Sequence, residues 1–293
     1  NDKQLEAMKY VQGPLLVLAG AGSGKTSVIT RKVAFLVQQC GIPAHRITAM
    51  TFTNKAAREM KERVGKLLSR EEAKGLSVST FHTFGLNLLR LELKNLPLKA
   101  NFSILDADDC KRILMDLMQR DNLSGAESKE LIAKAMKKIS DWKNDLVLPE
   151  QAHSTCETVD DVQLAHLYQL YERNLRAYNA VDFDDLIVMP ARLLQENAEV
   201  RDKWQNRVRY LLVDEYQDTN TAQYTLVKLL VGVMGQFTAV GDDDQSIYAW
   251  RGAKPENMAL LKEDFHNLKV IKLEQNYRST SRILKAANAV IEN

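Results

Sequence analysis

The chain has 293 residues, of which 45% are apolar, and its 40 lysines and arginines nearly balance its 38 aspartates and glutamates. This apolar share is enough for one large core or two ordinary ones, which excludes a disordered or purely fibrous protein. A net charge of +2 neither indicates nor excludes a nucleic-acid partner, so such a partner has to be argued from local features.

The cysteines and the apolar runs indicate the cellular compartment of the protein. Three widely spaced cysteines match neither a disulfide framework nor a zinc site. No apolar run approaches the roughly 20 residues that span a bilayer, and the N-terminal NDKQLEAMKY has no signal-peptide core. We therefore expect a soluble, cytoplasmic protein without a membrane partner. The final KAANAVIEN is a helical pattern without a cap, so we expect the C-terminus to be cut from a longer protein.

Short apolar or β-branched runs predict buried parallel strands, and helical patterns lie between the first of them. These runs are Leu15–Ala19, Ile47–Phe52, Val78–Phe81, Tyr210–Val213, Phe237–Val240 and Val270–Leu273. The fold class that they predict is α/β with a parallel sheet.

A long helical region separates the third predicted strand from the fourth. In ESKELIAKAMKKISDWKND the apolar residues fall on one helical face. A second set does the same further along the chain: Leu164, Leu167, Tyr171, Leu175 and Tyr178. We therefore expect an all-helical domain, about residues 85–195, inserted between strands of the first domain.

The first predicted strand, LLVLA, runs into GAGSGKT at residues 20–26 and then into an amphipathic helix. This order is that of a phosphate-binding P-loop, in which backbone N–H groups and a helix N-terminus surround phosphate oxygens. Lys25 is expected to reach the β- and γ-phosphates, and Thr26 to offer its hydroxyl to Mg²⁺. Ala19 replaces the first glycine of the pattern, which is tolerated only at negative φ. The residues expected to contact the nucleotide here are Ala21, Gly22, Ser23, Gly24, Lys25 and Thr26.

The fourth predicted strand ends in an acidic pair, in YLLVDEYQD. Asp214 is expected to hold Mg²⁺, and Glu215 to orient or deprotonate the attacking water. Such pairs also occur as plain surface residues at strand ends, and it is the P-loop that favours the functional interpretation.

Two further acidic stretches raise the question of metal chemistry. DFDDLI at residues 182–187 places three aspartates within four positions, which could ligate Mg²⁺ in a nuclease. GDDDQSIYAWRG at residues 241–252 places three carboxylates before a glutamine, aromatic residues and an arginine. The second stretch could hold a metal, hold a nucleic acid or only form a turn.

Seven motifs in order carry a resemblance to a known family: AGAGSGKT, TFTNKAAREM, STFHTFG, DFDDLI, LLVDEYQDTN, VGDDDQSIYAWRGA and KLEQNYRS. Together they resemble the N-terminal motif series of the UvrD/PcrA/Rep group of superfamily 1A DNA helicases, over nearly the whole chain. In that family the stretch matching DFDDLI is a structural junction, which the resemblance favours over a nuclease site.

The resemblance implies further nucleotide contacts. Gln4 matches the glutamine that reads the adenine edge, and Tyr277 matches a tyrosine that stacks on adenine. Arg278 matches an arginine that stabilises charge on the γ-phosphate, and Gln245 matches the γ-phosphate sensor. Where relatives often carry a basic residue that sandwiches adenine, this chain has Ser27.

The resemblance also implies that single-stranded DNA crosses the top of the sheet. Phe52 and Trp250 could stack on bases, which contributes about 1–3 kcal/mol per base irrespective of sequence. Thr53 and Asn54 could cap a helix whose free N–H groups suit a backbone phosphate, while the body of that helix reads as a solvated face. The candidate DNA-binding residues are Phe52, Thr53, Asn54, His82, Tyr248, Trp250 and Arg251.

Taken together, the resemblance implies an ATP- and Mg²⁺-dependent 3′-to-5′ single-stranded DNA translocase and helicase that unwinds duplex in replication or repair. The expected domains are a RecA-like ATPase domain (1–84 and 196–275), the helical insertion (85–195) and the start of a second RecA-like domain (276–293). The rest of that second domain would be missing, so the fragment should be weakly active or inactive. Partners would be single-stranded DNA, junctions with duplex, and replication or repair proteins.

Two other classes of protein remain open from the residues alone. A small-molecule P-loop kinase would share AGAGSGKT but should lack the aromatic-rich QSIYAWR. A non-catalytic strand-binding module would explain the aromatics but would leave Lys25 and Glu215 without a role.

Overall fold

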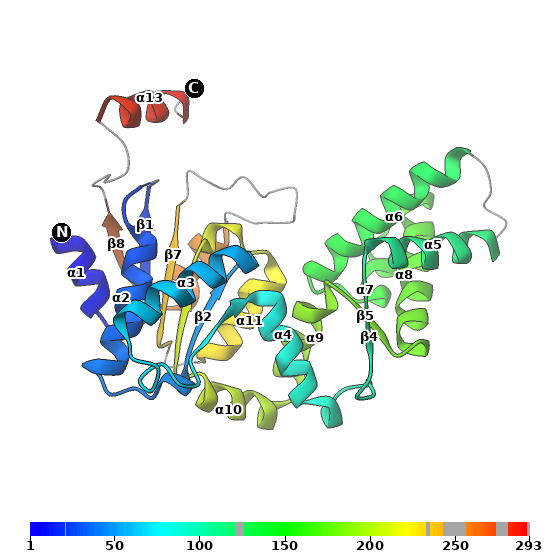
Figure 1. The fold of residues 1–293 in the computed structure, drawn as a ribbon. Helices are drawn as coiled ribbons and strands as arrows, with labels where there is room; N and C mark the ends of the chain where they lie inside the picture. The colour runs from blue at the N-terminus through cyan, green and yellow to red at the C-terminus, as the bar shows by residue number, and fades with distance from the viewer. Residues whose placement is uncertain (21, 121–125, 233–234, 243–255, 274–280, 292–293) are drawn as a thin grey trace. The chain divides into compact units, whose positions relative to one another are not determined.

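The computed structural model describes residues 1–20, 22–120, 126–232, 235–242, 256–273 and 281–291. Two compact units are formed, and Figure 1 shows the elements of each. Unit 1 comprises residues 1–81, 198–220 and 227–293, and unit 2 comprises residues 82–197 and 221–226. The functional domain limits expected from the sequence stay a prediction.

A six-stranded sheet in the order β3-β2-β6-β7-β1-β8 forms the centre of unit 1, and every neighbouring pair in it is parallel. Its strands are β1 (Leu15–Ala19), β2 (Ile47–Thr51), β3 (Ser77–Thr80), β6 (Tyr210–Val213), β7 (Phe237–Gly241) and β8 (Lys269–Leu273). The predicted α/β class and all the predicted strands are confirmed, with bounds that differ by no more than one residue.

Helices connect and cover these strands. Those of the first half are α1 (Asp2–Lys9), α2 (Lys25–Gln38), α3 (Asn54–Leu67), α4 (Phe81–Leu91), α5 (Ala107–Arg120), α6 (Ala126–Asn144) and α7 (Pro149–Ser154). Those of the second half are α8 (Val159–Ala177), α9 (Asp185–Glu196), α10 (Ala198–Arg207), α11 (Thr221–Val231), α12 (Glu256–Asp264) and α13 (Ser281–Ile291). Short 3₁₀ turns are η1 (Ala44–Arg46), η2 (Leu93–Asn95) and η3 (Tyr216–Asp218).

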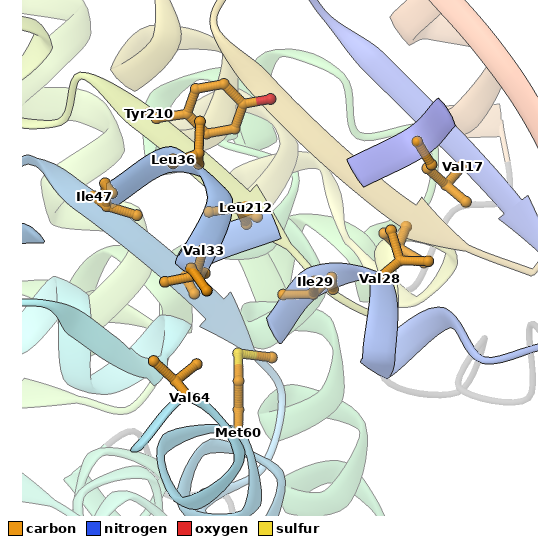
Figure 2. Packing of buried hydrophobic residues seen from close by; sticks show 14 of the residues in the cluster. Val17, Val28, Ile29, Val33, Leu36, Ile47, Met60, Val64, Tyr210 and Leu212 are labelled. Carbon is orange, nitrogen blue, oxygen red and sulfur yellow. The ribbon is translucent and has the colours of Figure 1, made fainter. Parts of the chain in front are cut away.

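One face of the sheet in unit 1 packs against α2 and α3. Alternate strand residues point to this face, so Ile47, Tyr210 and Leu212 meet apolar residues of the two helices (Figure 2). Val33 and Leu36 of α2 are completely buried there. Burying one such side chain contributes about 1.5–3 kcal/mol, so this layer fixes the start of α2 against the ends of the strands.

The opposite face of the same sheet has its own apolar layer. Phe237 of β7 lies with its ring 5.0 Å from that of Phe265, which follows α12. Because both faces are covered, the strands read as continuous apolar runs, and this is why the sequence showed them so clearly.

Unit 2 is mainly helical, with a small parallel pair of strands, β4 (Ser103–Leu105) and β5 (Ala180–Asp182). The predicted apolar faces of α6 and α8 meet in one core, which includes Ile132, Ile139 and Leu167. Tyr178 was wrongly placed on that face: it lies one residue beyond the end of α8 and is 64% exposed. A period of 3.6 residues cannot show where a helix stops.

Candidate functional site

The ends of two strands bring the P-loop and the acidic pair of unit 1 to one edge of the sheet. The P-loop follows β1, and Asp214 and Glu215 follow β6, two strands away across β7. In parallel sheets ligands bind outside the carboxyl ends of the strands. The Nζ atom of Lys25 lies 3.3 Å from Oε1 and 3.4 Å from Oε2 of Glu215. Residues 190 positions apart in the sequence therefore meet at this edge.

The P-loop is shaped by its glycines. Gly22 and Gly24 have φ of 76° and 83°, in the left-handed region that only glycine adopts freely. Gly24 is the residue before α2, so its conformation turns the loop into the helix that begins at Lys25. Ala19 ends β1 and is not among the described residues with positive φ, so the missing first glycine is accommodated. Thr26 lies in the first turn of α2, next to Lys25.

Gln4 of α1 lies against this loop. Its Nε2 donates to the backbone oxygen of Ser23 at 3.0 Å, and a side chain at Gly24 would come within 2.3 Å of the same nitrogen. The hydroxyl of Ser23 in turn donates to the oxygen of Gly20 at 2.6 Å. Gln4 was expected at the nucleotide on the resemblance alone, and the structure brings it to the P-loop.

Glu215 has a strained backbone. Its φ of 51° is left-handed although it is not glycine, which costs on the order of 1–2 kcal/mol. Its N–H donates to Oδ1 of Asp214 at 2.8 Å, and its carbonyl accepts from the N–H of Asp218 at 3.0 Å. This turn aims the carboxylate of Glu215 at Lys25. Strain of this kind, held in place by its surroundings, is typical of functional positions.

Gln217 is a site residue that sequence reasoning missed. It is 1% exposed, its Nε2 donates to Oε2 of Glu215 at 2.7 Å, and its Oε1 accepts from the N–H of Asp242 at 2.9 Å. A side chain at Gly241 would come 2.8 Å from that Oε1. Gln217 thus ties the end of β6 to the end of β7. Its position two residues after Glu215 in DEYQD was the only signal in the sequence.

Asp214 is 5% exposed at the end of β6. Burial raises the pKa of its carboxyl to about 6, and the negative charge of Glu215 adds to the effect. Its N–H donates to the oxygen of Met50, so it is fixed against the end of β2. A buried carboxylate with a raised pKa is poised to gain from a bound cation.

The residues present fit a magnesium ion with a nucleotide. Mg²⁺ prefers oxygen ligands and takes one or two carboxylates together with substrate phosphates. Asp214 and the hydroxyl of Thr26 supply such oxygens. Thr51, on the same strand face as Ile47, is buried, and its Oγ1 has no hydrogen-bond partner among the described residues. The Thr51 hydroxyl at this edge of the sheet is therefore able to hydrogen-bond a ligand.

The predicted DNA-contacting residues that the structure describes fall into two groups. In unit 1 the ring of Phe52 lies 5.2 Å from that of Phe81, tilted by 48°. Thr53 caps α3, accepting at its Oγ1 from the N–H of Ala56 at 3.1 Å, and Asn54 is the exposed first residue of that helix. In unit 2, His82 lies at the start of α4, where burial lowers the pKa of its imidazole.

Several predicted residues lie outside the described part of the chain. They are Ala21, Gln245, Tyr248, Trp250, Arg251, Tyr277 and Arg278. Most of GDDDQSIYAWRG falls there too, and only Gly241 and Asp242 are described.

The carboxylates of DFDDLI face a lysine. The Nζ atom of Lys143, which is 1% exposed, lies 2.8 Å from Asp182, 2.9 Å from Asp185 and 2.7 Å from Glu172. Asp184 accepts from the amide of Asn144 at 3.0 Å. Within the described ranges no group of three or more acidic, histidine or cysteine side chains is arranged to hold a metal. The junction interpretation thus has a physical basis, which is a buried ion network.

Comparisons with known proteins agree with this site. The model of the UvrD/REP helicase N-terminal domain matches residues 1–266. The ATP-dependent DNA helicase Rep of Escherichia coli K12 is 58% identical over all 293 residues of this chain, which cover 43% of that relative. Rep of Buchnera aphidicola subsp. Schizaphis graminum is 46% identical over the same span, 44% of its length. PcrA of Staphylococcus aureus Mu50 is 44% identical, with 40% of its length covered. The chain thus spans less than half the length of these relatives.

Among the helices that the structure describes, none is long and apolar enough to cross a membrane.

Proposed function

Because the chain belongs to the UvrD/REP helicase N-terminal domain family, we propose that it is the ATP- and single-stranded-DNA-binding part of an ATP-dependent DNA helicase. The observation that carries the proposal is the approach of Lys25 to Glu215, at 3.3 Å, although the two residues are 190 positions apart in the sequence. A phosphate-binding lysine beside a general base is the arrangement that nucleotide hydrolysis requires.

We assign the chemistry as follows. Lys25 exchanges its pairing with Glu215 for the β- and γ-phosphates, which frees that carboxylate. Glu215, still held by Gln217, orients a water and accepts its proton as the water oxygen bonds to the γ-phosphorus. The bond from the γ-phosphorus to the bridging oxygen breaks, which gives ADP and phosphate. Mg²⁺, held by Asp214 and Thr26, would neutralise charge on the phosphate oxygens.

The other assigned roles rest on the family. Gln4 reads the adenine edge, Tyr277 stacks on the base, and Arg278 and Gln245 act at the γ-phosphate. The Gln245→Ala variant of the full-length protein should keep its ATP and DNA affinities but lose DNA stimulation of hydrolysis. Unchanged stimulation in that variant would mean that the stretch is only a turn.

Single-stranded DNA is the proposed polymer substrate. Phe52 offers a face for base stacking, and the N-terminus of α3, capped by Thr53, suits a backbone phosphate. Neither contact distinguishes between bases, which suits a motor that must move along any sequence. We propose 3′-to-5′ movement in the cytoplasm, action at junctions with duplex DNA, and a role in replication or repair with proteins of those processes.

The chain by itself should be a poor enzyme. In RecA-like motors ATP lies between two such domains, and the relatives are more than twice as long as the matched region. We expect the chain to bind MgATP weakly, to hydrolyse it very slowly and to unwind no duplex. Robust turnover stimulated by DNA in the isolated chain would contradict this.

One experiment separates the proposal from its rivals. ATP turnover by the full-length protein is measured with and without single-stranded DNA, and again with Lys25→Ala. Helicase function requires that DNA stimulates turnover and that Lys25→Ala abolishes it. A small-molecule kinase would show no stimulation by DNA, and a strand-binding module would bind DNA equally well but hydrolyse nothing.

A further inference from the structure

Lys32 is a completely buried lysine that the proposed chemistry does not use. It lies on α2, seven positions after Lys25 and thus two helical turns further along the same helix. Its Nζ atom donates to the backbone oxygens of Ala7 and Tyr10, at 2.9 and 2.5 Å. These carbonyls belong to the last turn and the C-cap of α1, the helix that carries Gln4.

The end of α1 is a natural place for such an amine. The last carbonyls of a helix have no partner within the helix, and its C-terminus carries a partial negative charge. A cationic donor that bonds two of those oxygens satisfies both needs. The ammonium group also lies 5.6 Å from the centre of the Tyr210 ring, whose face attracts cations.

Helix α1 is short and buries little apolar surface of its own. It has eight residues, shorter than the roughly 12–15 at which isolated helices become marginal in water. Ala7 is its one buried residue, and Leu5 is 47% exposed. At its outer side, Glu6 pairs with Lys269 of β8 at 3.0 Å, an exposed contact of small worth. Figure 1 shows α1 beside α2 and β8, at the edge of the sheet.

Burying this charge has a cost. Removal from water lowers the pKa of Lys32 to about 7, and within the described part of the chain no carboxylate pairs with it. Among the described residues, the other titratable groups near it are the thiol of Cys40 and the phenol of Tyr210, with the phenol of Tyr10 close to that of Tyr210. A methionine would fill the same space without that cost. In some proteins a buried polar group of this kind is retained because it specifies a single arrangement of the elements around it.

The two ends of α1 are thus both tied to the P-loop helix. Gln4 bonds the backbone of Ser23 in the P-loop, two residues before α2 begins, and Lys32 of α2 bonds the last turn of α1. If Lys32 lost its hold, α1 could shift along α2, and Gln4 would move with it. A displacement of about 1 Å is enough to weaken a positioned contact substantially.

We propose that Lys32 is a positioning residue for base recognition: by holding the C-terminal end of α1, it keeps Gln4 at the P-loop, where the nucleotide base is read. The inference rests on the proposed function, because it assigns Gln4 to the base. It adds a residue without a nucleotide contact to the determinants of preference for adenine.

The test uses the full-length protein at saturating single-stranded DNA, with ATP and GTP as substrates. Lys32→Met should raise KM for ATP about threefold to tenfold, leave kcat nearly unchanged and reduce the preference for ATP over GTP. Arg31→Met removes an exposed charge from the neighbouring position of α2, and should change none of these values. Amide hydrogen exchange in α1, a readout independent of turnover, should become faster in Lys32→Met alone.

A double variant decides whether Lys32 acts through Gln4. In a Gln4→Ala background, where the base-reading amide is gone, Lys32→Met should have no further effect on the ATP to GTP preference. An undiminished effect there would overturn the proposal, as would a fall in kcat at unchanged KM. If Lys32→Met does not fold, Lys32→Gln takes its place, because the glutamine amide can still donate to a backbone oxygen. This variant should show a smaller change of the same kind. An unchanged KM and preference in it would overturn the proposal equally. A wild-type protein that does not hydrolyse ATP would contradict the proposed function instead.

Discussion

Lys25 and Lys143 both face carboxylates from distant parts of the chain, but the two amines are held very differently. Among the residues that the structure describes, Lys25 pairs with Glu215 alone, at 3.3 Å, and both side chains keep contact with solvent, at 13% and 34% exposure. Lys143 is enclosed by three carboxylates within 2.9 Å. Burial alone would lower the pKa of Lys143, but Asp182, Asp185 and Glu172 outweigh it and hold that pKa well above its ordinary value.

The comparison shows what separates a reactive ion pair from a structural one. Asp182, Asp185 and Glu172 would all lose this counter-charge if the lysine moved, so this lysine cannot serve a substrate. Lys25 can leave Glu215 for a phosphate at little cost, because the pair is partly solvated and involves a single carboxylate. A lysine that is free to exchange its carboxylate for a phosphate, as Lys25 is, therefore distinguishes the candidate nucleotide site from the buried network of Lys143.

The largest effect that we expect comes from removing the enclosed lysine. Lys143→Met takes away a counter-charge that three carboxylates share, two of them buried, and should lower the free energy of unfolding by about 3–5 kcal/mol. Urea denaturation measures the change. Lys137 of the same helix pairs with Asp141 at 2.8 Å but is 72% exposed, so Lys137→Met should cost no more than about 0.5 kcal/mol. An equal loss of unfolding free energy in Lys143→Met and Lys137→Met would mean that the enclosed lysine is no more structural than an exposed one.

At the candidate nucleotide site, the pH dependence of nucleotide affinity tests the state of Asp214. The pKa of Asp214 is raised to about 6, so its carboxyl is protonated below that pH and cannot bind a cation. The affinity for Mg²⁺-nucleotide should therefore rise as the pH increases through 6, by up to about tenfold per unit below it. Asp214→Asn should bind more weakly and lack this rise, which separates the carboxyl from the titration of the nucleotide itself.

The same group makes an opposite contribution to stability. Between pH 3.8 and about 6 the folded state binds more protons at Asp214 than the unfolded state does. The free energy of unfolding should thus fall as the pH rises through this window, and it should fall less in Asp214→Asn. If the wild type and the variant have the same pH dependence of stability, Asp214 does not carry the raised pKa.

A smaller effect is expected at the two threonine caps. Thr53 caps α3 in unit 1, and Thr158 caps α8 in unit 2, each with a bond of 3.1 Å. Replacing either by alanine should cost about 1 kcal/mol of stability. Only Thr53→Ala should also weaken single-stranded DNA binding, because only α3 is proposed to receive a phosphate. Equal DNA affinity in the two variants would remove α3 from the DNA site.

Strands and motifs were predictable because their signals are local. A strand covered on both faces is rich in apolar or β-branched residues, and GSGKT and DEYQD are each short continuous stretches of sequence. The meeting of Lys25 and Glu215 followed from the parallel sheet, which puts the ends of its strands at one edge. The limits of α8 did not follow, because periodicity continues past a helix end, and Tyr178 was misplaced for that reason.

The roles of Gln217, Lys32 and Lys143 could not be predicted, because each depends on a partner brought near only by folding. Lys32 and Lys143 look like ordinary surface lysines of amphipathic helices. Their burial is decided by α1 in one case and by the turn after β5 in the other. Gln217 likewise takes its role from Asp242, which follows another strand.

The central claim is that the loosely held pair of Lys25 and Glu215 is a centre of ATP hydrolysis. It is tested most directly by the rate of hydrolysis in Glu215→Gln at saturating single-stranded DNA, measured in the full-length protein together with the MgATP affinity. The variant keeps an oxygen that can accept from Gln217 but cannot take a proton from water. The rate should fall at least about 100-fold while the affinity changes little. A rate within about tenfold of the wild type would contradict the account.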